Sequence, residues 1–201
     1  VGLSVVNALS IWLKAEVRRK PDVFVQEYKQ GKPLAPVKKV GKTNETGTTI
    51  TFQPDPEIFK EIVFDKEVIL THFRQQAYLT RGTKINVIDE RTLLVSGEGK
   101  EAKEHSQEYT FYFEGGIVSY VQYLNRGEEV KHHNIFYANK EYEGIQVEVA
   151  LQYVEELSTR EMGFANNIHT IEGGMHITGF RSAITRLLND YSRKNGYLKE
   201  K

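Results

Sequence analysis

The longest periodic pattern of hydrophobic positions lies near the C-terminus, between residues 177 and 191. Its apolar side chains recur at steps of three and four, which places them on one face of a helix. They are Ile177, Phe180, Ile184, Leu187, Leu188 and Tyr191. Gly173-Gly174 precedes the pattern and predicts a sharp turn of the backbone. We therefore predict a C-terminal helix that begins after the paired glycines and is buried along its apolar face.

Alternating patterns in the first third of the chain predict antiparallel strands. Apolar and charged residues alternate over 13–17, and Lys20-Pro21-Asp22 predicts a turn into a return strand over 23–28. The β-branched residues of 49–52 predict another strand. The glycine and prolines of 30–39 indicate an edge or a loop. Before these strands, residues 1–10 predict a loop that enters a short helix.

The middle of the chain combines a helix with two strands. Asp65 can cap a helix that runs to about Leu79, with Ile69, Phe73 and Ala77 on one face and Gly82 just after its end. Strands are predicted over residues 83–89 and 108–113. The polar, glycine-containing stretch 94–107 between them is predicted to be an exposed insertion, and the sequence leaves open whether it is ordered.

A change of organisation is predicted at Gly115-Gly116. A short helix follows over 117–125, and the charged stretch 126–131 is predicted to be a junction between domains. Residues 135–138 predict a short strand, and the unbroken alternation of 145–153 predicts a longer one, with 161–166 as its hairpin partner. The predicted organisation is residues 1–116 as one domain, 117–131 as helix and junction, and 132–201 as a second domain. The fold class is α/β with mixed sheets.

Composition limits the classes of function. The chain has 201 residues, of which 39% are hydrophobic, so it can form a substantial core. It carries 27 basic and 27 acidic residues, so bulk charge gives no argument for nucleic acid, and any DNA contact must come from a local cluster. There is no Cys, which excludes disulfides and thiolate metal sites and fits a reducing compartment. Neither a membrane-spanning apolar run nor a signal peptide is present, so we expect a cytoplasmic protein without a membrane partner.

The residues alone do not specify a reaction. Adjacent His132-His133 would point to opposite faces of a strand, and His169 and His176 lack a recognisable carboxylate partner, so no metal site is predicted. The serines near the N-terminus lack a nucleophile-elbow context, and no Walker sequence appears. Gly2 at the entry to a short helix could expose backbone N–H groups to a phosphate, since helix N-termini attract anions.

Six segments, taken in order along the chain, resemble the gyrase B family of bacterial type IIA DNA topoisomerases, whose ATPase domains belong to the GHKL ATPases. They are VGLSVVNALS, ETGTTITFQPD, YFEGGIVSYVQYLN, EGIQVEVALQY, FANNIHTIEGGMH and GFRSAITRLLNDY. The B protein of topoisomerase IV is the close alternative, and NNIHTIEGG favours gyrase. The first residues correspond to the middle of a family motif, so the chain is expected to be a fragment covering the C-terminal part of the ATPase domain and the first part of the transducer domain.

The resemblance implies specific roles for a few residues. Val1, Gly2 and Leu3 would present backbone N–H groups to the ATP phosphates, and Thr48 would lie at the adenine end of the nucleotide; otherwise Thr48 is simply a β-branched residue in a strand. Arg181 would face the cavity through which DNA passes, with Arg186 a weaker candidate. The alternative for Arg181 is a salt bridge within the chain.

The resemblance also implies what the whole protein binds. It would be an ATP-operated dimeric clamp that uses ATP and Mg²⁺, associates with the gyrase A protein as an A2B2 heterotetramer, dimerises through B on ATP binding, and passes and negatively supercoils DNA. The transducer would contain a left-handed βαβ crossover. The family's general base, magnesium ligand, adenine-binding aspartate and γ-phosphate lysine match no residue of this chain, so no catalytic residue is assigned and the 201-residue chain alone is expected to be inactive. A non-enzymatic nucleic-acid-binding module with the same crossover is the competing class.

Overall fold

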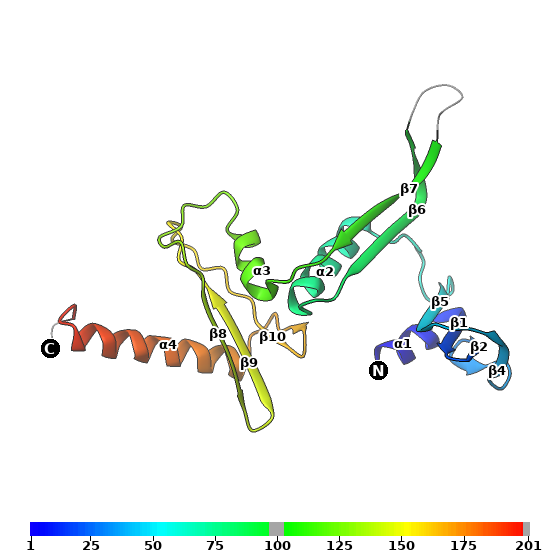
Figure 1. Ribbon diagram of the computed structural model, residues 1–201, viewed down its shortest axis with the longest axis horizontal. Helices are drawn as coiled ribbons and strands as arrows, with labels where there is room; N and C mark the ends of the chain where they lie inside the picture. The colour runs from blue at the N-terminus through cyan, green and yellow to red at the C-terminus, as the bar shows by residue number, and fades with distance from the viewer. Residues whose placement is uncertain (97–102, 199–201) are drawn as a thin grey trace. The chain divides into compact units, whose positions relative to one another are not determined.

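The computed structural model describes residues 1–96 and 103–198 (Figure 1). The chain packs as two compact units, Val1–Asp65 (unit 1) and Lys66–Lys201 (unit 2). Helices combine with antiparallel strand pairs in the described residues, which confirms the predicted mixed α/β class. The boundaries predicted at residues 116 and 131 stay a prediction, because compact packing units and family domains need not coincide.

Unit 1 is an antiparallel sheet preceded by a short helix. The sheet has the strand order β3-β2-β1-β5, and β4 also pairs with β2. The predicted hairpin is confirmed, with Leu13 opposite Tyr28 and Arg19 opposite Asp22. The elements are α1 (Gly2–Ala8), β1 (Ser10–Arg19), β2 (Asp22–Lys29), β3 (Lys32–Pro33), β4 (Lys38–Lys42) and β5 (Thr46–Pro54). The stretch 30–39 thus contributes short edge strands, as expected of its proline content.

Hydrogen bonds fix the end of this sheet at which α1 joins β1. Asp55 is buried, and its carboxylate accepts hydrogen bonds from Gln30 Nε2 at 2.7 Å and from the backbone N–H of Glu57 at 2.9 Å. Across β1 and β2, Trp12 Nε1 donates to Glu27 Oε2 at 2.8 Å. A buried carboxylate needs such donors, so this end of the sheet has a specified geometry.

Unit 2 begins with α2 (Lys66–Leu79), followed by the hairpin of β6 (Ile85–Ser96) and β7 (Lys103–Phe111) and by α3 (Gly116–Leu124). Its core contains Leu70, Ala77 and Phe111. The predicted helix is present, and its buried residues are Leu70, Ala77 and Tyr78, whereas Phe73 is 38% exposed. The helix is turned by about one residue from the predicted orientation because Tyr78 packs against aromatic rings that follow β7.

The β6–β7 hairpin is longer than predicted. The two strands pair from Ile85 opposite Phe111 to Ser96 opposite Lys103, so much of the predicted insertion 94–107 belongs to strands. An antiparallel ladder satisfies backbone groups whatever the side chains are, and a polar sequence can therefore continue a strand. Residues 97–102 lie outside the described residues.

An aromatic stack joins α2 to α3. The ring of Tyr78 lies 3.7 Å from that of Phe113 and 4.8 Å from that of Tyr120, both nearly parallel to it. Arg74 Nη1 donates to the hydroxyl of Tyr123 at 2.9 Å. Tyr78 is only 4% exposed, and this burial raises the pKa of its hydroxyl above its usual value.

The predicted strand over 145–153 is present, but its predicted partner was wrong. β9 (Ile145–Leu151) pairs with β8 (Phe136–Tyr142), not with 161–166. Glu143 and Gly144 both have positive φ, 50° and 78°, as the tight turn between two neighbouring strands requires. Asn166 and Asn167 make an equivalent turn between the short strands β10 (Phe164–Ala165) and β11 (Ile168–His169).

The predicted C-terminal helix is present as α4 (Met175–Lys194), directly after Gly173 and Gly174, which have φ of 82° and 152°. Its predicted burial was wrong. Leu187 is 66% exposed and Tyr191 59% exposed, and no residue of α4 is buried. The left-handed crossover requires parallel strands, and the described strands pair only antiparallel, so it stays a prediction. In the described part of the chain, no helix is both long and apolar enough to cross a membrane.

Candidate functional site

The start of α1 brings Val1, Gly2 and Leu3 together at an exposed helix terminus. Val1 is the N-cap residue and makes no side-chain cap hydrogen bond, and the first hydrogen bond inside the helix runs from the N–H of Val5 to the carbonyl of Val1 at 3.1 Å. The N–H groups of Gly2 and Leu3 precede it and therefore have no acceptor inside the helix. Ser10 Oγ donates to the carbonyl of Val6 at 2.6 Å and fixes the other end of α1.

Thr48 lies on β5, exposed, opposite Val17 of β1. Pro54, at the end of the same strand, pairs with Ser10 next to the junction of α1 and β1. Thr48 is therefore about 20 Å along the strand from that junction, at about 3.4 Å per residue. The two groups of predicted nucleotide-site residues belong to one unit, but the register separates Thr48 from the end of the sheet where α1 is attached.

Sequence reasoning missed an apolar pocket beside α1. It has a volume of about 260 Å³ and is lined by Val5, Leu9, Phe52 and residues of 59–64. Phe64 contacts Phe52 edge-on with ring centroids 6.5 Å apart. The apolar run Ile62-Val63-Phe64 was the available signal, but without regular periodicity it predicted no element.

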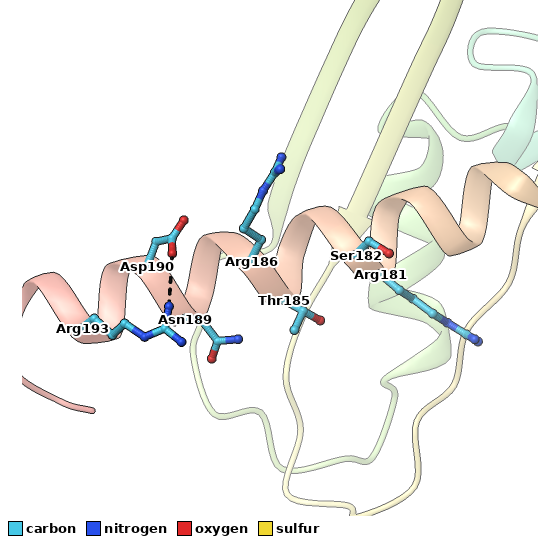
Figure 2. Close-up of a pocket in the computed structure, with 7 residues that line it drawn as sticks. All are labelled: Arg181, Ser182, Thr185, Arg186, Asn189, Asp190 and Arg193. Atoms are coloured by element: carbon cyan, nitrogen blue, oxygen red, sulfur yellow. Dashed lines mark ion pairs between the residues drawn. The ribbon is translucent and has the colours of Figure 1, made fainter. Parts of the chain in front are cut away.

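On α4, the predicted DNA-facing arginines lie beside a shallow depression of about 470 Å³ (Figure 2). Figure 2 shows Arg181 and Arg186 extending to different sides of the helix. Ser182, Thr185 and Asn189 contribute hydroxyl and amide groups, and Arg193 pairs loosely with Asp190 at 3.7 Å. Together, the side chains around the depression present hydrogen-bond donors suited to phosphate oxygens.

Arg181 is held by a carboxylate within the same chain. Its Nε donates to Glu161 Oε2 at 2.8 Å, and its Nη2 contacts the same oxygen. The Glu161 carboxylate raises the pKa of the Arg181 guanidinium above its ordinary value. The side chain nevertheless remains 67% exposed, and such exposed pairs contribute little to stability. The salt bridge expected as the alternative is therefore present, and the DNA role of Arg181 stays a prediction. Among the described residues no ion pair involves Arg186.

His132 and His176 form hydrogen bonds within the chain. His132 Nδ1 lies 2.6 Å from the carbonyl oxygen of Asn134, and its Nε2 accepts from the N–H of Tyr153 at 3.0 Å. His176 Nε2 lies 3.1 Å from Thr170 Oγ1. Within the described ranges, no group of three or more His, Asp or Glu side chains is arranged to hold a metal ion.

Known proteins are similar to this chain over its whole length. A family model described as DNA gyrase B matches residues 116–201. The DNA gyrase B protein of Streptococcus pyogenes serotype M3 is 46% identical over 201 residues, which is 100% of this chain and 29% of the relative. The DNA gyrase B protein of Bacillus mycoides is 43% identical over 201 residues, which is 100% of this chain and 47% of the relative. Over its full length, this chain is therefore similar to DNA gyrase B proteins.

Solved structures of the gyrase B family agree with this fold. The 43K ATPase domain of Thermus thermophilus gyrase B, in complex with an aminocoumarin, matches with a TM-score of 0.80 and 35% identity over 100% of this chain and 52% of that chain. The gyrase B protein from Myxococcus xanthus matches with a TM-score of 0.81 at 20% identity, covering 94% of this chain and 52% of that chain, which supports the fold alone. The chain thus spans about half or less of the length of these proteins.

Proposed function

We propose that this chain forms part of the ATP-binding and transducer region of a DNA gyrase B protein, which couples ATP binding and hydrolysis to DNA strand passage and negative supercoiling. The observation that carries the proposal is 46% identity over the full 201 residues to a relative named as the B component of DNA gyrase. The intact protein would be an ATP-dependent topoisomerase of the cytoplasm, with the gyrase A protein and a second gyrase B protein as partners.

The exposed first turn of α1 supports a phosphate-binding role for Val1, Gly2 and Leu3. Their N–H groups lie at the positive end of a helix, and a glycine at this place lets a ligand approach the backbone closely. Thr48 would contribute at the adenine end. The helix is short, so the site would depend on groups besides these, with ATP and Mg²⁺ bound by the whole protein.

Arg181 is the residue we propose to contact DNA in strand passage, with Arg186 in a lesser role. A guanidinium matches the geometry of phosphate oxygens. The Arg181 side chain is 67% exposed and can therefore reach a phosphate, which would have to compete with the Glu161 carboxylate, whose side chain is only 26% exposed. The domain limits proposed for this activity are 1–116 for the ATPase part and 132–201 for the transducer part; the family model begins at residue 116.

The 201-residue chain alone should not hydrolyse ATP. No residue of it matches the general base or the γ-phosphate lysine that the family resemblance implies, and positioning of the attacking water and charge stabilisation supply most of the catalysis in phosphoryl transfer. Single-turnover hydrolysis of radiolabelled ATP by the purified chain tests this expectation. Release of phosphate above the rate of a buffer blank would contradict it.

The decisive experiment uses the full-length B chain that contains this segment, with its A partner, ATP and relaxed circular DNA. Negative supercoiling on a gel is the expected result; ATP-dependent relaxation or decatenation without supercoiling would indicate a topoisomerase IV activity instead. Arg181→Ala should retain ATPase activity and lose strand passage. Unchanged supercoiling by this variant would assign Arg181 to its salt bridge with Glu161 alone.

A further inference from the structure

Positive charge is concentrated on one edge of the sheet in unit 1. Residues 29–42 contain five lysines and no carboxylate, although the whole chain is neutral. Each of these lysines is exposed. They are Lys29, Lys32, Lys38, Lys39 and Lys42. A neutral protein with such a segment presents a local positive field that bulk charge conceals.

The fold brings these lysines into a row along one edge of the sheet, and strand alternation divides them between its two faces. One face carries Lys39 and Lys42, and the other carries Lys29, Lys32 and Lys38. β3 and β4 both pair with β2, with Lys32 opposite Lys29 at one end and Lys42 opposite Asp22 at the other. The row follows seven residue steps of β2 and is therefore about 24 Å long, at about 3.4 Å per step. A DNA duplex carries one phosphate charge per about 1.7 Å of helix axis, so a duplex stretch as long as the row offers more phosphates than the five lysines can contact.

An ion-pair cluster holds part of the row in place. Lys39 Nζ lies 2.8 Å and Lys42 Nζ 3.0 Å from Asp22 Oδ1. The hydrogen bond to Asp22 raises the pKa of Lys39, and the two lysines lower the pKa of Asp22. Two ammonium groups share one carboxylate, so this cluster keeps a net positive charge and a fixed position at the edge.

We propose that this lysine edge, formed by β3, β4 and the end of β2, is a surface that binds the phosphate backbone of duplex DNA without reading its sequence. The inference rests on the proposed function only in taking DNA as a ligand of the protein. The lysine edge lies in unit 1, whereas Arg181 lies in unit 2. The edge includes none of the residues assigned to nucleotide binding. Lysine ammonium groups act as point charges toward phosphate, and five of them suit electrostatic rather than base-specific binding.

Lysine and proline on an edge strand also prevent pairing with other chains. Three exposed aliphatic side chains, Leu34, Val37 and Val40, lie on the same edge and would suit an acidic protein partner. The test must therefore separate DNA binding from edge protection and from binding of an acidic protein.

The experiment measures binding of a fluorescent 20-base-pair duplex of mixed sequence to the full 201-residue chain between 50 and 200 mM NaCl. The test variant is Lys32→Gln/Lys38→Gln/Lys42→Gln, which leaves Lys39 paired with Asp22. The control is Lys60→Gln/Lys84→Gln/Lys140→Gln, which removes the same charge from exposed positions elsewhere. Each phosphate contact contributes about 0.9 to the slope of log affinity against log salt, and the test variant lacks three of these contacts. Across this fourfold salt range, wild type and control should therefore lose about 40-fold more affinity than the test variant.

Each other outcome overturns the proposal. Equal salt slopes for test and control variants would show that only net charge matters, and unchanged binding with increased self-association of the test variant would assign the lysines to edge protection. Displacement of duplex by poly-glutamate at lower charge concentration than by unlabelled duplex would indicate an acidic protein. If Arg181→Ala loses duplex binding and the test variant does not, the proposed function stands and DNA binding by the lysine edge is rejected. If the wild type binds no duplex at 50 mM NaCl, both the proposed function and the lysine-edge proposal are rejected.

Discussion

At the scale of single residues, Tyr78 joins α2 to α3 through its aromatic ring. The ring stacks on Phe113 and Tyr120 and is nearly excluded from solvent. Tyr78→Ala should lower the free energy of unfolding by about 3–5 kcal/mol, since it leaves a cavity between two rings that cannot close easily. Tyr78→Phe keeps the ring and is the control. Denaturant unfolding measures both, and a loss of under about 1 kcal/mol in the alanine variant would mean that α2 and α3 do not depend on this stack.

Asp89 makes a contribution to the free energy of unfolding that depends on pH. Hydrogen bonds from the Arg91 side chain and backbone lower the pKa of Asp89 from 3.8 to about 2. A lowered carboxyl pKa stabilises the folded state fully above about pH 4, and this stabilisation is lost as the pH falls through about 2. Asp89→Asn should therefore destabilise the protein at pH 6, and the difference from wild type should shrink toward pH 2. Urea unfolding at both pH values checks this; a constant difference would contradict it.

At the scale of secondary-structure elements, two glycines near α4 should respond in opposite ways to the same substitution. A Cβ added at Gly163 would lie 2.3 Å from Ile177 Cδ1, whereas one added at Gly179 would meet no atom within 4 Å. Gly163→Ala should destabilise the protein by about 1–3 kcal/mol through overpacking. Gly179→Ala, inside the helix, should stabilise it by about 1 kcal/mol.

Thermal unfolding followed by circular dichroism measures both glycine variants. Ile177→Ala combined with Gly163→Ala removes the colliding atoms, so the double variant should be more stable than the sum of the two single effects predicts. Additive losses would show that the neighbourhood of Gly163 relaxes without cost.

Sequence patterns predicted elements better than their partners. The hairpin of 13–28 and the helix after Gly174 follow from local periodicity and turn residues, and both are present. The partner of β9 was missed because the two-residue turn at Glu143-Gly144 contains Glu where the usual signal is Asn or Asp. For the candidate site, the family resemblance drew attention to Arg181 and a salt bridge was the expected alternative, but only the fold identifies Glu161 as its partner. The lysine edge became visible only when strand pairing aligned residues 29–42.

At the scale of the whole molecule, exposed apolar side chains include those of α4 and of the β8–β9 hairpin. Leu187 and Tyr191 project from α4, while Phe136, Tyr142 and Ile145 lie on one face of the β8–β9 hairpin and are each at least half exposed. Exposed patches of this kind indicate surfaces that associate. The isolated 201-residue chain should therefore self-associate as its concentration rises.

Sedimentation velocity over a range of concentrations measures this association. Leu187→Glu should weaken it, and Thr185→Glu, which adds the same charge to the polar side of α4, should weaken it much less. Equal effects of the two substitutions would mean that charge rather than the apolar stripe controls association.

Trp12, whose indole donates a hydrogen bond to Glu27, makes it possible to follow the unfolding of unit 1 and unit 2 by separate optical signals. Trp12 is the single tryptophan of the chain and belongs to unit 1, whereas only Tyr28 of the 11 tyrosines lies there. Indole fluorescence therefore reports the local environment of β1 and β2, while the near-ultraviolet dichroism of the tyrosines arises mainly from unit 2. If the two signals change at different denaturant concentrations, unit 1 and unit 2 unfold as separate cooperative bodies, and a single midpoint would mean that they unfold together.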